Sequence, residues 1–592
     1  MMTKKRIYRM LATAVIAGGT FVGVTSCEDM LDSKPDKALE PKQAYRNRFD
    51  ADAAVIGVYG KFLGLAKHYI VLNELRADLM DVTANADVNL QQISYHQASD
   101  QNPYASPKPF YELILYCNDV LRNFDIMFAD SKLLQAEYNE RYSDIATLRC
   151  WLYLQVAIHW GQVPYVTEPL ASVDDLKDLE GAPVLGLQEM VRELIAVMEK
   201  LPSHELYALN STLNANIDGY STNLFFINKK FFLGDLYLWN GDYLKAAMQY
   251  KDVMMTPVSG VAIYDSYKVK YADVASNDDL AIGYIRDKEQ DYKSLINNNT
   301  QGWKSMFIRP QDPLFNSEWI WVLPFDSRFK QSSPFVDLFS NSGGKYLVRP
   351  AQLAMDQWNA QVQRNGFTFD QRGRFTYAME GGQPVIKKHI YNYDPLLPLQ
   401  RTGKWFLGRA ALLHLRFAEA ANRDDHSKVA WAFLNPGGIR VTYDDPAITD
   451  VTKELDTFLP YPYNFAARST NVPFFRDDWH RHDGIRGRAY VTALTLDSVK
   501  YFNMSVKPRV LTNAEALKRD IEDKLIMEGA LELAYEGNRW ADLLRVAIRR
   551  NDPSFIAAKI HDKLQKAGKT AEASQAKARL EAGDWFLPFR ME

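Results

Sequence analysis

The chain has 592 residues, of which 47% are hydrophobic and 24% charged, so it can bury a large core and is neither disordered nor fibrous. Its formal net charge is −3, and its Lys and Arg residues are scattered along the sequence. Without a basic stripe for phosphate contacts, no nucleic-acid partner is expected.

The N-terminus has the pattern of an export signal, because basic residues at Lys4, Lys5, Arg6 and Arg9 precede an apolar run over residues 10–24. The stretch that ends in Cys27 resembles the lipobox of bacterial lipoproteins, in which the Cys is acylated and becomes the first mature residue. We predict a lipoprotein signal peptide over residues 1–26 and lipidation of Cys27. A plain secretory signal or a short membrane helix is the alternative, although three glycines interrupt the apolar run.

Residues 27–40 are polar and acidic and include Pro35. Such a segment has too few apolar residues to pack, so it is predicted to be a short lipidated tether. The two other cysteines, Cys117 and Cys150, lie in apolar, helix-like surroundings, where they are either buried thiols or one disulfide.

From residue 41 to about residue 260 the apolar residues recur every three or four positions, which predicts an array of helices. Within it, Gly234, Tyr237, Ala246 and Tyr250 have the offsets of a tetratricopeptide repeat, in which small residues let two antiparallel helices approach. Asn240-Gly241-Asp242 supplies the turn between them. One helical-repeat hairpin is therefore predicted over residues 231–255.

The second half of the chain mixes helices with irregular segments. Helices are predicted at Leu412–Asn422, at Val429–Leu434 and, as one long amphipathic element, at Asp520–Arg550. Residues 261–393 and 437–506 are rich in aromatic residues, Asn, Pro and Gly, which indicates loops with short strands such as Trp319–Val322. Binding residues are expected in such loops, because a rigid scaffold positions them.

Four segments in this order carry a recognisable pattern: a helix that ends in Trp160-Gly161-Gln162-Val163-Pro164, the strand at Asn316–Ile320, an Ala-Glu-Ala helix at Leu412–Asn422, and Ile526–Arg545. Together they resemble the SusD/RagB family of outer-membrane nutrient-binding lipoproteins, and Ile526–Arg545 is similar to the family's C-terminal helix pair. The pattern departs from the family at Gly529, where an Arg is usual, at Asn538, where a His is common, and at Pro436-Gly437-Gly438.

The resemblance implies a mainly α fold: a helical-repeat, tetratricopeptide-like scaffold with long irregular loops and a few short strands. It implies one SusD-like domain over residues 41–592, with a helical half at 41–260 and a C-terminal half at 261–592. It also implies a lipid-anchored protein on the outside of the outer membrane that binds glycan and delivers it to a SusC-like TonB-dependent transporter. Peptide cargo, as in RagB-like relatives, is the first alternative, and a purely protein-binding helical-repeat factor is the second.

We expect the charged residues of the C-terminal segment to stabilise the fold rather than to form an active site. Glu532, Glu536, Arg539 and Arg545 have helical spacings that permit ion pairs along the helix. The run Asp477–Asp483 contains two His and three Asp, but neighbouring arginines favour carboxylate pairing over a metal ion.

Catalytic and cofactor motifs are missing from the sequence, which contains no P-loop, dinucleotide fingerprint, paired-His zinc helix or nucleophile elbow. We therefore expect a protein that is not an enzyme and that needs neither a cofactor nor a metal ion.

Sugar binding needs a flat aromatic face beside planar polar groups. Tyr292, Asn299 and Trp303 form such a set in one loop-like stretch, and Tyr95 and Tyr104 add aromatic side chains from another. The resemblance implies an aromatic arc made by the loop after the first helices and by a mid-chain loop, located here at Asp78–Tyr104 and Tyr292–Phe307. The glycan-binding candidates are Asp78, Tyr95, Tyr104, Tyr292, Asn299 and Trp303. The alternative is that Tyr292 and Trp303 only pack their loop onto the helices.

Overall fold

The computed structural model describes residues 45–170, 182–217, 220–257, 267–269, 283–284, 295–296, 302–309, 318–326, 332–439, 459–467, 469–507 and 510–591. The predicted signal peptide, the lipidation site Cys27, the tether, Tyr292 and Asn299 lie outside these ranges. All elements below belong to one compact unit that starts at Asn47.

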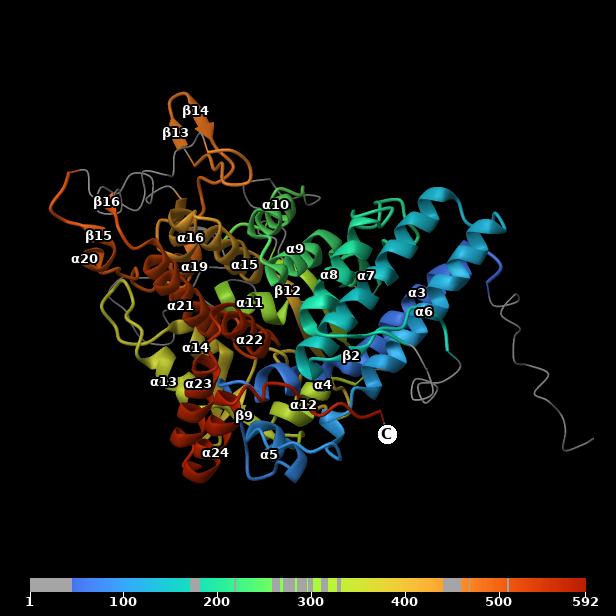
Figure 1. Cartoon of the computed structure of the whole chain (residues 1–592), viewed down its shortest axis with the longest axis horizontal. Helices are drawn as coiled ribbons and strands as arrows, with labels where there is room; N and C mark the ends of the chain where they lie inside the picture. Colours follow the sequence, from blue (N-terminus) through green and yellow to red (C-terminus); the bar gives the residue numbers. More distant parts are fainter. Residues whose placement is uncertain are drawn as a thin grey trace, which may run out of the picture. The chain divides into compact units, whose positions relative to one another are not determined.

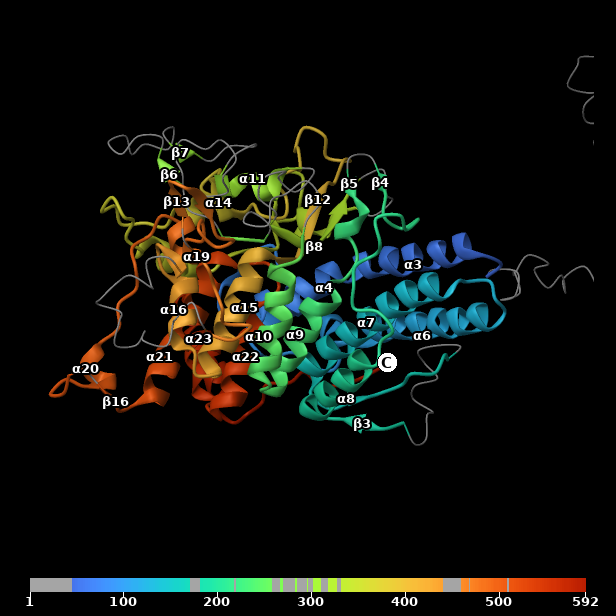
Figure 2. The same ribbon diagram turned by 90° about the horizontal axis from the view of Figure 1, so that it is seen from above.

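Long helices form the N-terminal half, as the periodicity predicts. α3 (Arg48–Phe62) begins where the Asn47 side chain accepts a hydrogen bond from the backbone N–H of Phe49. It packs against α6 (Lys108–Ala129) and α7 (Gln135–Trp160), and Figures 1 and 2 show the three helices side by side. α7 is buried almost throughout its C-terminal half, so it is the central helix of this group.

The stretch Arg48–Leu75 is, by length and composition, long and apolar enough to cross a membrane. It also lies inside the folded unit: Val55, Phe62 and Leu72 are fully buried there. Because burial in a core explains its apolar character, this stretch is a core element of the fold.

The predicted repeat hairpin is confirmed by α9 (Lys229–Asn240) and α10 (Tyr243–Met254). Gly241 ends α9 in the left-handed region with φ 85°. A Cβ on Gly234 would lie 2.6 Å from the Tyr250 ring, so only glycine permits this approach of the two helices. A second hairpin, α15 (Ala410–Arg423) with α16 (Ser427–Leu434), packs beside the first.

The single long helix predicted over Asp520–Arg550 is wrong. The structure has two helices, α21 (Ala514–Glu532) and α22 (Arg539–Arg550), separated by a turn. Within that turn Tyr535 has φ 72° and Gly537 has φ 91°, which a helix cannot accommodate. The helix pair that the resemblance implies is therefore present.

A buried carboxylate stabilises this turn from the other end of the sequence. Glu74, which is fully buried in η3 (Val71–Leu75), accepts hydrogen bonds from the backbone N–H groups of Tyr535, Gly537 and Asn538 at 3.0, 2.7 and 3.0 Å. Burial raises the pKa of Glu74 to about 7, and these hydrogen bonds lower it only in part.

The strands pair two by two, all antiparallel among those described. The longest pair is β8 (Trp319–Phe325) with β12 (Gly403–Arg409), and β8 confirms the strand predicted at Trp319–Val322. Trp321 and Trp405, one from each strand, stack on the Phe62 ring of α3. Their ring centroids lie 5.5 and 4.8 Å, respectively, from the Phe62 centroid. This ribbon therefore joins the C-terminal half to the N-terminal helices.

Shorter strand pairs lie in the loop regions. They are β1 (Met80–Val82) with β9 (Val348–Pro350), β2 (Val163–Pro164) with β3 (Val184–Leu185), β4 (Asn216–Ile217) with β5 (Tyr220–Ser221), β6 (Gly283–Tyr284) with β7 (Leu295–Ile296), β10 (Tyr377–Glu380) with β11 (Gln383–Ile386), β13 (Ser469–Asn471) with β14 (Phe474–Arg476), and β15 (Phe502–Asn503) with β16 (Val510–Leu511).

The remaining helices are short or lie near the C-terminus. They are η2 (Leu63–Leu65), α4 (Ala66–Ile70), α5 (Val88–Ser94), η4 (Pro103–Ala105), α8 (Leu187–Glu199), η6 (Thr222–Leu224), α11 (Gly302–Ile308), α12 (Pro334–Phe339), α13 (Gln352–Asn359), α14 (Gln371–Thr376), α19 (Gly484–Arg488), α20 (Ser498–Tyr501), α23 (Ser554–Lys566) and α24 (Thr570–Glu581).

The ion pairs predicted along the C-terminal helix connect different elements instead. Glu532 contacts Arg372, Arg409 and Arg488 at 2.9, 2.8 and 2.9 Å, and all four side chains are buried. Arg539 pairs with Asp78, and Arg545 pairs with Glu419 at 2.6 Å in addition to Asp542 in its own helix. The helical spacing in the sequence picked out charged residues that do form ion pairs. Most of their partners, however, lie in other elements of the fold.

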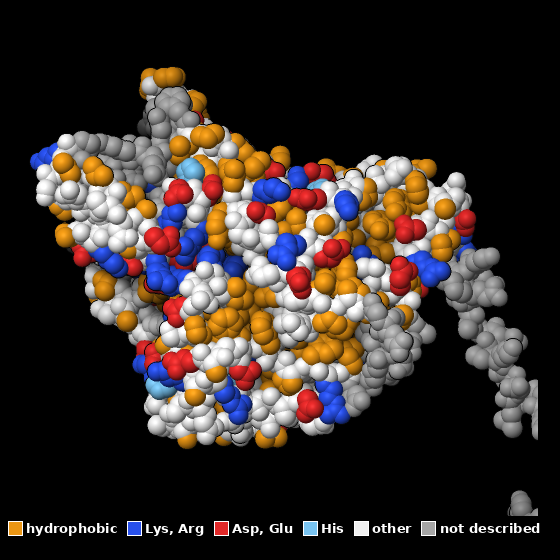
Figure 3. Space-filling model, in the orientation of Figure 1, with side chains coloured by type: hydrophobic (Ala, Val, Ile, Leu, Met, Phe, Trp, Pro, Cys, Tyr) orange, Lys and Arg blue, Asp and Glu red, His pale blue; other side chains and the backbone are white. Residues whose placement is uncertain are grey.

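Charges on the surface are mixed. On the face shown in Figure 3, basic and acidic side chains alternate among hydrophobic ones without a continuous basic band. This face accordingly has none of the electrostatic footprint of a nucleic-acid-binding surface.

Candidate functional site

Trp303, a predicted glycan contact, lies in the core of the C-terminal half. It belongs to α11, its side chain is 1% exposed, and its indole Nε1 donates a hydrogen bond to Glu532 Oε1 at 3.2 Å. The Phe307 ring packs against it with a centroid distance of 5.0 Å. In this structure Trp303 therefore has no open face for a sugar ring, in agreement with the alternative that it packs its loop onto the scaffold.

Asp78 is engaged in a buried ion pair. Its two carboxylate oxygens accept from Arg539 Nε and Nη2 at 2.6 and 2.8 Å. Burial by itself would raise the pKa of Asp78, but the Arg539 guanidinium outweighs it and holds that pKa below its ordinary value. Asp78 thus connects the segment before β1 to the C-terminal helix pair.

Tyr95 and Tyr104 flank the loop that follows α5, and both side chains are buried. Lys569 Nζ lies 5.9 Å from the centre of the Tyr95 ring, and Lys67 Nζ lies 5.1 Å from that of Tyr104. Neither aromatic ring is displayed on the surface. Contact of Tyr95, Tyr104, Asp78 and Trp303 with a glycan stays a prediction, and Tyr292 and Asn299 lie outside the described residues.

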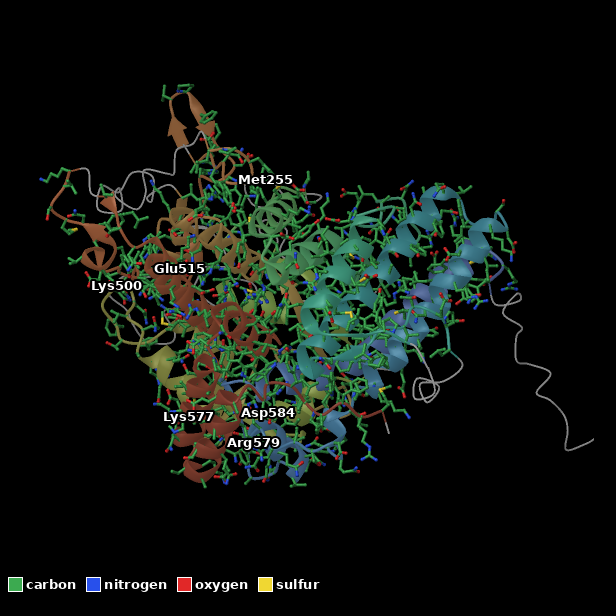
Figure 4. The ribbon with its side chains drawn as sticks, in the orientation of Figure 1. Met255, Lys500, Glu515, Lys577, Arg579 and Asp584 are labelled. Carbon is green, nitrogen blue, oxygen red and sulfur yellow. The ribbon has the colours of Figure 1, made fainter. Side chains whose placement is uncertain are left out.

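Residues between Tyr95 and Tyr104 line a cavity. A cavity of about 450 Å³, within the usual range for small-molecule sites, lies between this loop and the C-terminal segment. We call it the C-terminal cavity. Its lining residues are Arg76, Ile93, His96, Ala98, Ser99, Asp100, Arg579, Asp584, Phe586, Leu587 and Pro588. Figure 4 labels Arg579 and Asp584 near the C-terminal end of α24, close to α5.

Backbone contacts position the C-terminal segment as one wall of this cavity. The N–H of Leu587 donates to the carbonyl oxygen of His159 at 2.8 Å, next to the end of α7. A Cβ on Gly161 would lie 2.8 Å from the Phe586 ring, so this glycine allows the ring to approach. The indole Nε1 of Trp585 donates to the carbonyl oxygen of Leu580 at 2.9 Å. The wall is thereby attached both to α7 and to α24.

Arg76 is the most deeply buried charge of the cavity lining, with 2% of its surface exposed. Its guanidinium lies 4.0 Å from the centre of the Trp540 ring, and Nη2 donates to the carbonyl oxygen of Trp585. Nη1 is buried without a hydrogen-bond partner among the described residues. Burial lowers the pKa of Arg76 to about 9, an effect that nearby Asp584 opposes.

His96 and Arg579 also line the cavity. His96 Nε2 is bonded to the carbonyl oxygen of Arg76 at 2.8 Å, and Arg579 Nη1 donates to the carbonyl oxygen of His96 at the same distance. Burial, followed by the charge of Arg76, lowers the pKa of His96 well below its ordinary value. His96 is therefore a neutral imidazole at neutral pH.

Two carboxylates complete the lining. Asp100 pairs with Arg590 at 2.9 Å, whereas the exposed Asp584 lies near Arg76. The cavity thus combines guanidinium donors, carboxylate acceptors, the Ser99 hydroxyl and the edge of an aromatic ring. Such a set suits a ligand whose groups both donate and accept hydrogen bonds, as sugar hydroxyls do.

Sequence reasoning located the loop but not the cavity. Residues 579–588 carry no motif, and their approach to residues 96–100 joins positions almost five hundred residues apart. One signal was available: Trp585, Phe586, Leu587 and Phe589 follow a charged helix. An apolar cluster at that position indicates that the segment docks on the fold.

The other groups considered from the sequence are buried in this structure. His480 and His482 are buried, and His482 Nδ1 accepts from the N–H of Ile439 at 3.4 Å. Among the residues the structure covers, no cluster of His, Cys, Asp or Glu could bind a metal ion. Cys117 and Cys150 are buried free thiols, and burial raises the pKa of each to about 12.

Comparison with known proteins gives one curated relative and several solved structures. No family model matches the chain. The SusD-like protein P25 of Formosa agariphila is 26% identical over 176 residues, which cover 27% of this chain and 31% of that protein. The match thus spans about a third of the curated relative.

The fold similarity extends much further along the chain. A SusD superfamily protein from Bacteroides vulgatus has a TM-score of 0.51 at 12% identity, with 90% of this chain and 92% of that chain covered. A SusD-like carbohydrate-binding protein from Bacteroides fragilis also has a TM-score of 0.51, at 13% identity, with 86% and 88% covered. Surface glycan-binding protein A from Bacteroides uniformis has a TM-score of 0.50 at 14% identity, with 84% and 87% covered. The mainly helical, SusD-like architecture that the resemblance implies is confirmed at the level of the fold.

Proposed function

We propose, from the premise that this chain has a SusD-like fold, that it binds glycan on the cell surface and passes it to a SusC-like TonB-dependent transporter in the outer membrane. The proposal describes a binding protein rather than an enzyme. The observation that carries it is the C-terminal cavity, which opens beside the loop after α5, one of the two loops where the family resemblance locates glycan binding.

The lining chemistry supports a saccharide ligand. Arg579, Asp584 and Ser99 offer charged and hydroxyl groups on exposed side chains, while Phe586 and Ile93 add apolar surface. Sugar rings have apolar C–H faces and hydroxyls that both donate and accept, so they match this mixture. Two of the solved structures with this fold are named for carbohydrate or glycan binding.

The N-terminal sequence supports the proposed membrane anchor. Lipidation of Cys27 would attach the chain to the outer membrane, and residues 28–40 would let the folded unit move over the transporter. A single cavity of this size gives modest affinity, because sugar hydroxyls exchange water for protein partners with little net gain. A high local concentration beside the transporter would compensate.

Native gel retardation of the full-length chain, purified in detergent, tests the proposal against a panel of host and plant polysaccharides. We expect at least one glycan to retard the chain, and Phe586→Ala to weaken this at least fivefold. Lys577→Gln is the matched control, since Lys577 lies on α24 outside the cavity lining. Retardation by no glycan, together with peptides that copurify with the chain, would assign it to peptide cargo instead.

A further inference from the structure

We infer that the C-terminal cavity binds an acidic sugar, through a carboxylate or sulfate group that reaches Arg76 and Arg579. This rests on the proposed function, because it names the class of glycan that the same cavity takes. The argument depends on how the charges around the cavity are partnered.

Buried guanidinium groups in this protein almost always have a carboxylate partner. Arg372, Arg409, Arg488, Arg539 and Arg545 are all buried and pair with Asp or Glu at 2.6–2.9 Å. Such pairing is the rule because an isolated buried charge costs several kcal/mol.

Within the described ranges, Arg76 and Arg149 are the buried arginines without an ion pair. Arg149 donates instead to the Asn118 side-chain oxygen at 2.9 Å. Arg76 makes a single hydrogen bond through its guanidinium, to the carbonyl oxygen of Trp585, and its Nη1 has no partner. A buried cation with an unused donor beside a cavity is the arrangement that a bound anion would complete.

The guanidinium of Arg76 is also fixed in orientation before any ligand arrives. Trp540 covers one face of it and Trp585 accepts from Nη2, so the plane of the group is set by the fold. Binding therefore costs little side-chain entropy at this position. Arg76 belongs to the cavity lining, and its unpartnered Nη1 is the donor that an anionic group in the cavity would use.

The cavity lining contains two arginines and two carboxylates, and Arg590, which lies outside the lining, adds a third cation. Arg76 and Arg579 contribute two cations, and His96 is neutral because burial lowers its pKa. Asp100 pairs with Arg590, so Asp584, which acts on Arg76, is the one lining carboxylate left to oppose the two lining arginines.

Aromatic and hydroxyl groups favour a sugar as the carrier of that anion. The Phe586 ring and the Ser99 hydroxyl line the same cavity as the two arginines. A free phosphate or sulfate ion would leave the apolar part of the 450 Å³ volume unfilled, whereas a sugar ring would fill it.

The experiment compares acidic glycans with their neutral counterparts on the full-length chain in detergent. The probes are oligogalacturonate and its carboxyl-reduced form, and chondroitin sulfate and its desulfated, carboxyl-reduced form. We expect at least tenfold tighter binding of the acidic member of one pair at low ionic strength, and a smaller ratio as salt screens the charges. The pair that shows the difference identifies carboxylate or sulfate as the recognised group.

Two cavity variants and one control assign the effect to this site. Arg579→Gln is expected to weaken binding of the acidic glycan at least fivefold and to weaken binding of the neutral counterpart by a clearly smaller factor, because Gln keeps an N–H donor but loses the charge. Asp584→Asn is expected to tighten binding of the acidic glycan, because it removes a competing carboxylate. Lys577→Gln removes a neighbouring cation from α24 outside the lining and is expected to change neither affinity.

The outcomes separate this inference from the function on which it rests. Equal binding of the acidic and neutral members, or no effect of Arg579→Gln and Asp584→Asn, would overturn the acidic preference while glycan binding remained. Binding of polyglutamate with no binding of any glycan would overturn both proposals.

Discussion

Three arginines from different elements, Arg372 in α14, Arg409 in β12 and Arg488 in α19, converge on the carboxylate of Glu532 in α21. Glu318 and Glu536 accept further hydrogen bonds from Arg409 at 2.8 Å. Glu318, Glu532 and Glu536 are all buried, and each needs a cation nearby. Arg409 supplies that cation to all three carboxylates. At the scale of single residues, the C-terminal half is thus organised around buried charges.

Replacing Arg409 by Met is therefore expected to lower the free energy of unfolding by about 3–5 kcal/mol, because Glu532 and Glu536 would lose a buried counter-charge. Arg401→Met is the matched control: Arg401 pairs with Asp337 at 2.8 Å on the surface and should cost at most about 1 kcal/mol. Urea denaturation followed by circular dichroism compares the two. Similar midpoints for both variants would contradict the role given to the buried cluster.

Acid should weaken the fold through buried histidines. Burial lowers the pKa of His482 from 6.5 to about 3, with Lys268 and Lys251 adding to the effect. The unfolded chain binds a proton at His482 below pH 6.5 whereas the folded chain does not, so stability is present above pH 6.5 and is lost as the pH falls toward 3. At pH 5 the loss from this group is about 2 kcal/mol.

In the variant His482→Asn, the loss of stability between pH 7 and pH 5 should be about 2 kcal/mol smaller than in the parent chain. Asn can still accept the hydrogen bond from Ile439, so the local contact is retained. Thermal or urea unfolding at the two pH values measures this difference. A variant that loses as much stability as the parent would show that His482 is not one of the acid-sensitive groups.

At the scale of elements, close packing of helix pairs depends on small residues at the crossing. Gly234 in α9 faces the ring of Tyr250 in α10, and the Tyr250 hydroxyl donates to Asp235 at 2.6 Å. The same α10 packs against α15 of the second hairpin, so a change at Gly234 affects both repeat-like hairpins.

Gly234→Ala is expected to destabilise the chain by about 1–3 kcal/mol, because the added Cβ overlaps the Tyr250 ring. Adding Tyr250→Leu to Gly234→Ala should cost less than the sum of the two single changes, since the smaller side chain makes room for the methyl group. Gly60→Ala in α3 is the control, as nothing lies within 4 Å of its added Cβ. Strict additivity in the double-mutant cycle would contradict the contact.

At the scale of the whole molecule, the proposed function draws on both ends of the sequence. The C-terminal residues 584–588 form a wall of the cavity beside the loop after α5. The N-terminal residues carry the predicted lipidation site Cys27. We therefore treat ligand binding and membrane attachment as separable properties of the chain.

Cys27→Ala should move the chain from the membrane fraction to the soluble fraction of cells, because the lipid anchor supplies most of its membrane affinity. Its affinity for glycan in solution should stay unchanged, since the cavity lies in the folded unit from Asn47 onward. Fractionation with immunoblotting and gel retardation measure the two properties. Continued membrane association of the variant would rule out Cys27 as the anchor.

Local patterns in the sequence determined which elements form. The offsets of Gly234, Tyr237, Ala246 and Tyr250 predicted the hairpin of α9 and α10, and the short strand-like run at Trp319–Val322 predicted β8. These predictions succeed because helical periodicity and turn chemistry act within a few residues. The SusD-like fold was predicted separately, from the resemblance of four segments and their order to the SusD/RagB family.

Only the tertiary structure decided which distant groups meet. The helix predicted over Asp520–Arg550 is interrupted by a turn that Glu74 stabilises. Glu532 pairs with three arginines from distant parts of the sequence, and Trp303 is buried rather than exposed. The tertiary structure also brought Arg76 and Arg579 to one cavity across about five hundred residues of chain. Such contacts depend on the packing of whole elements and on the desolvation of charges, and neither quantity is encoded in the spacing of neighbouring residues.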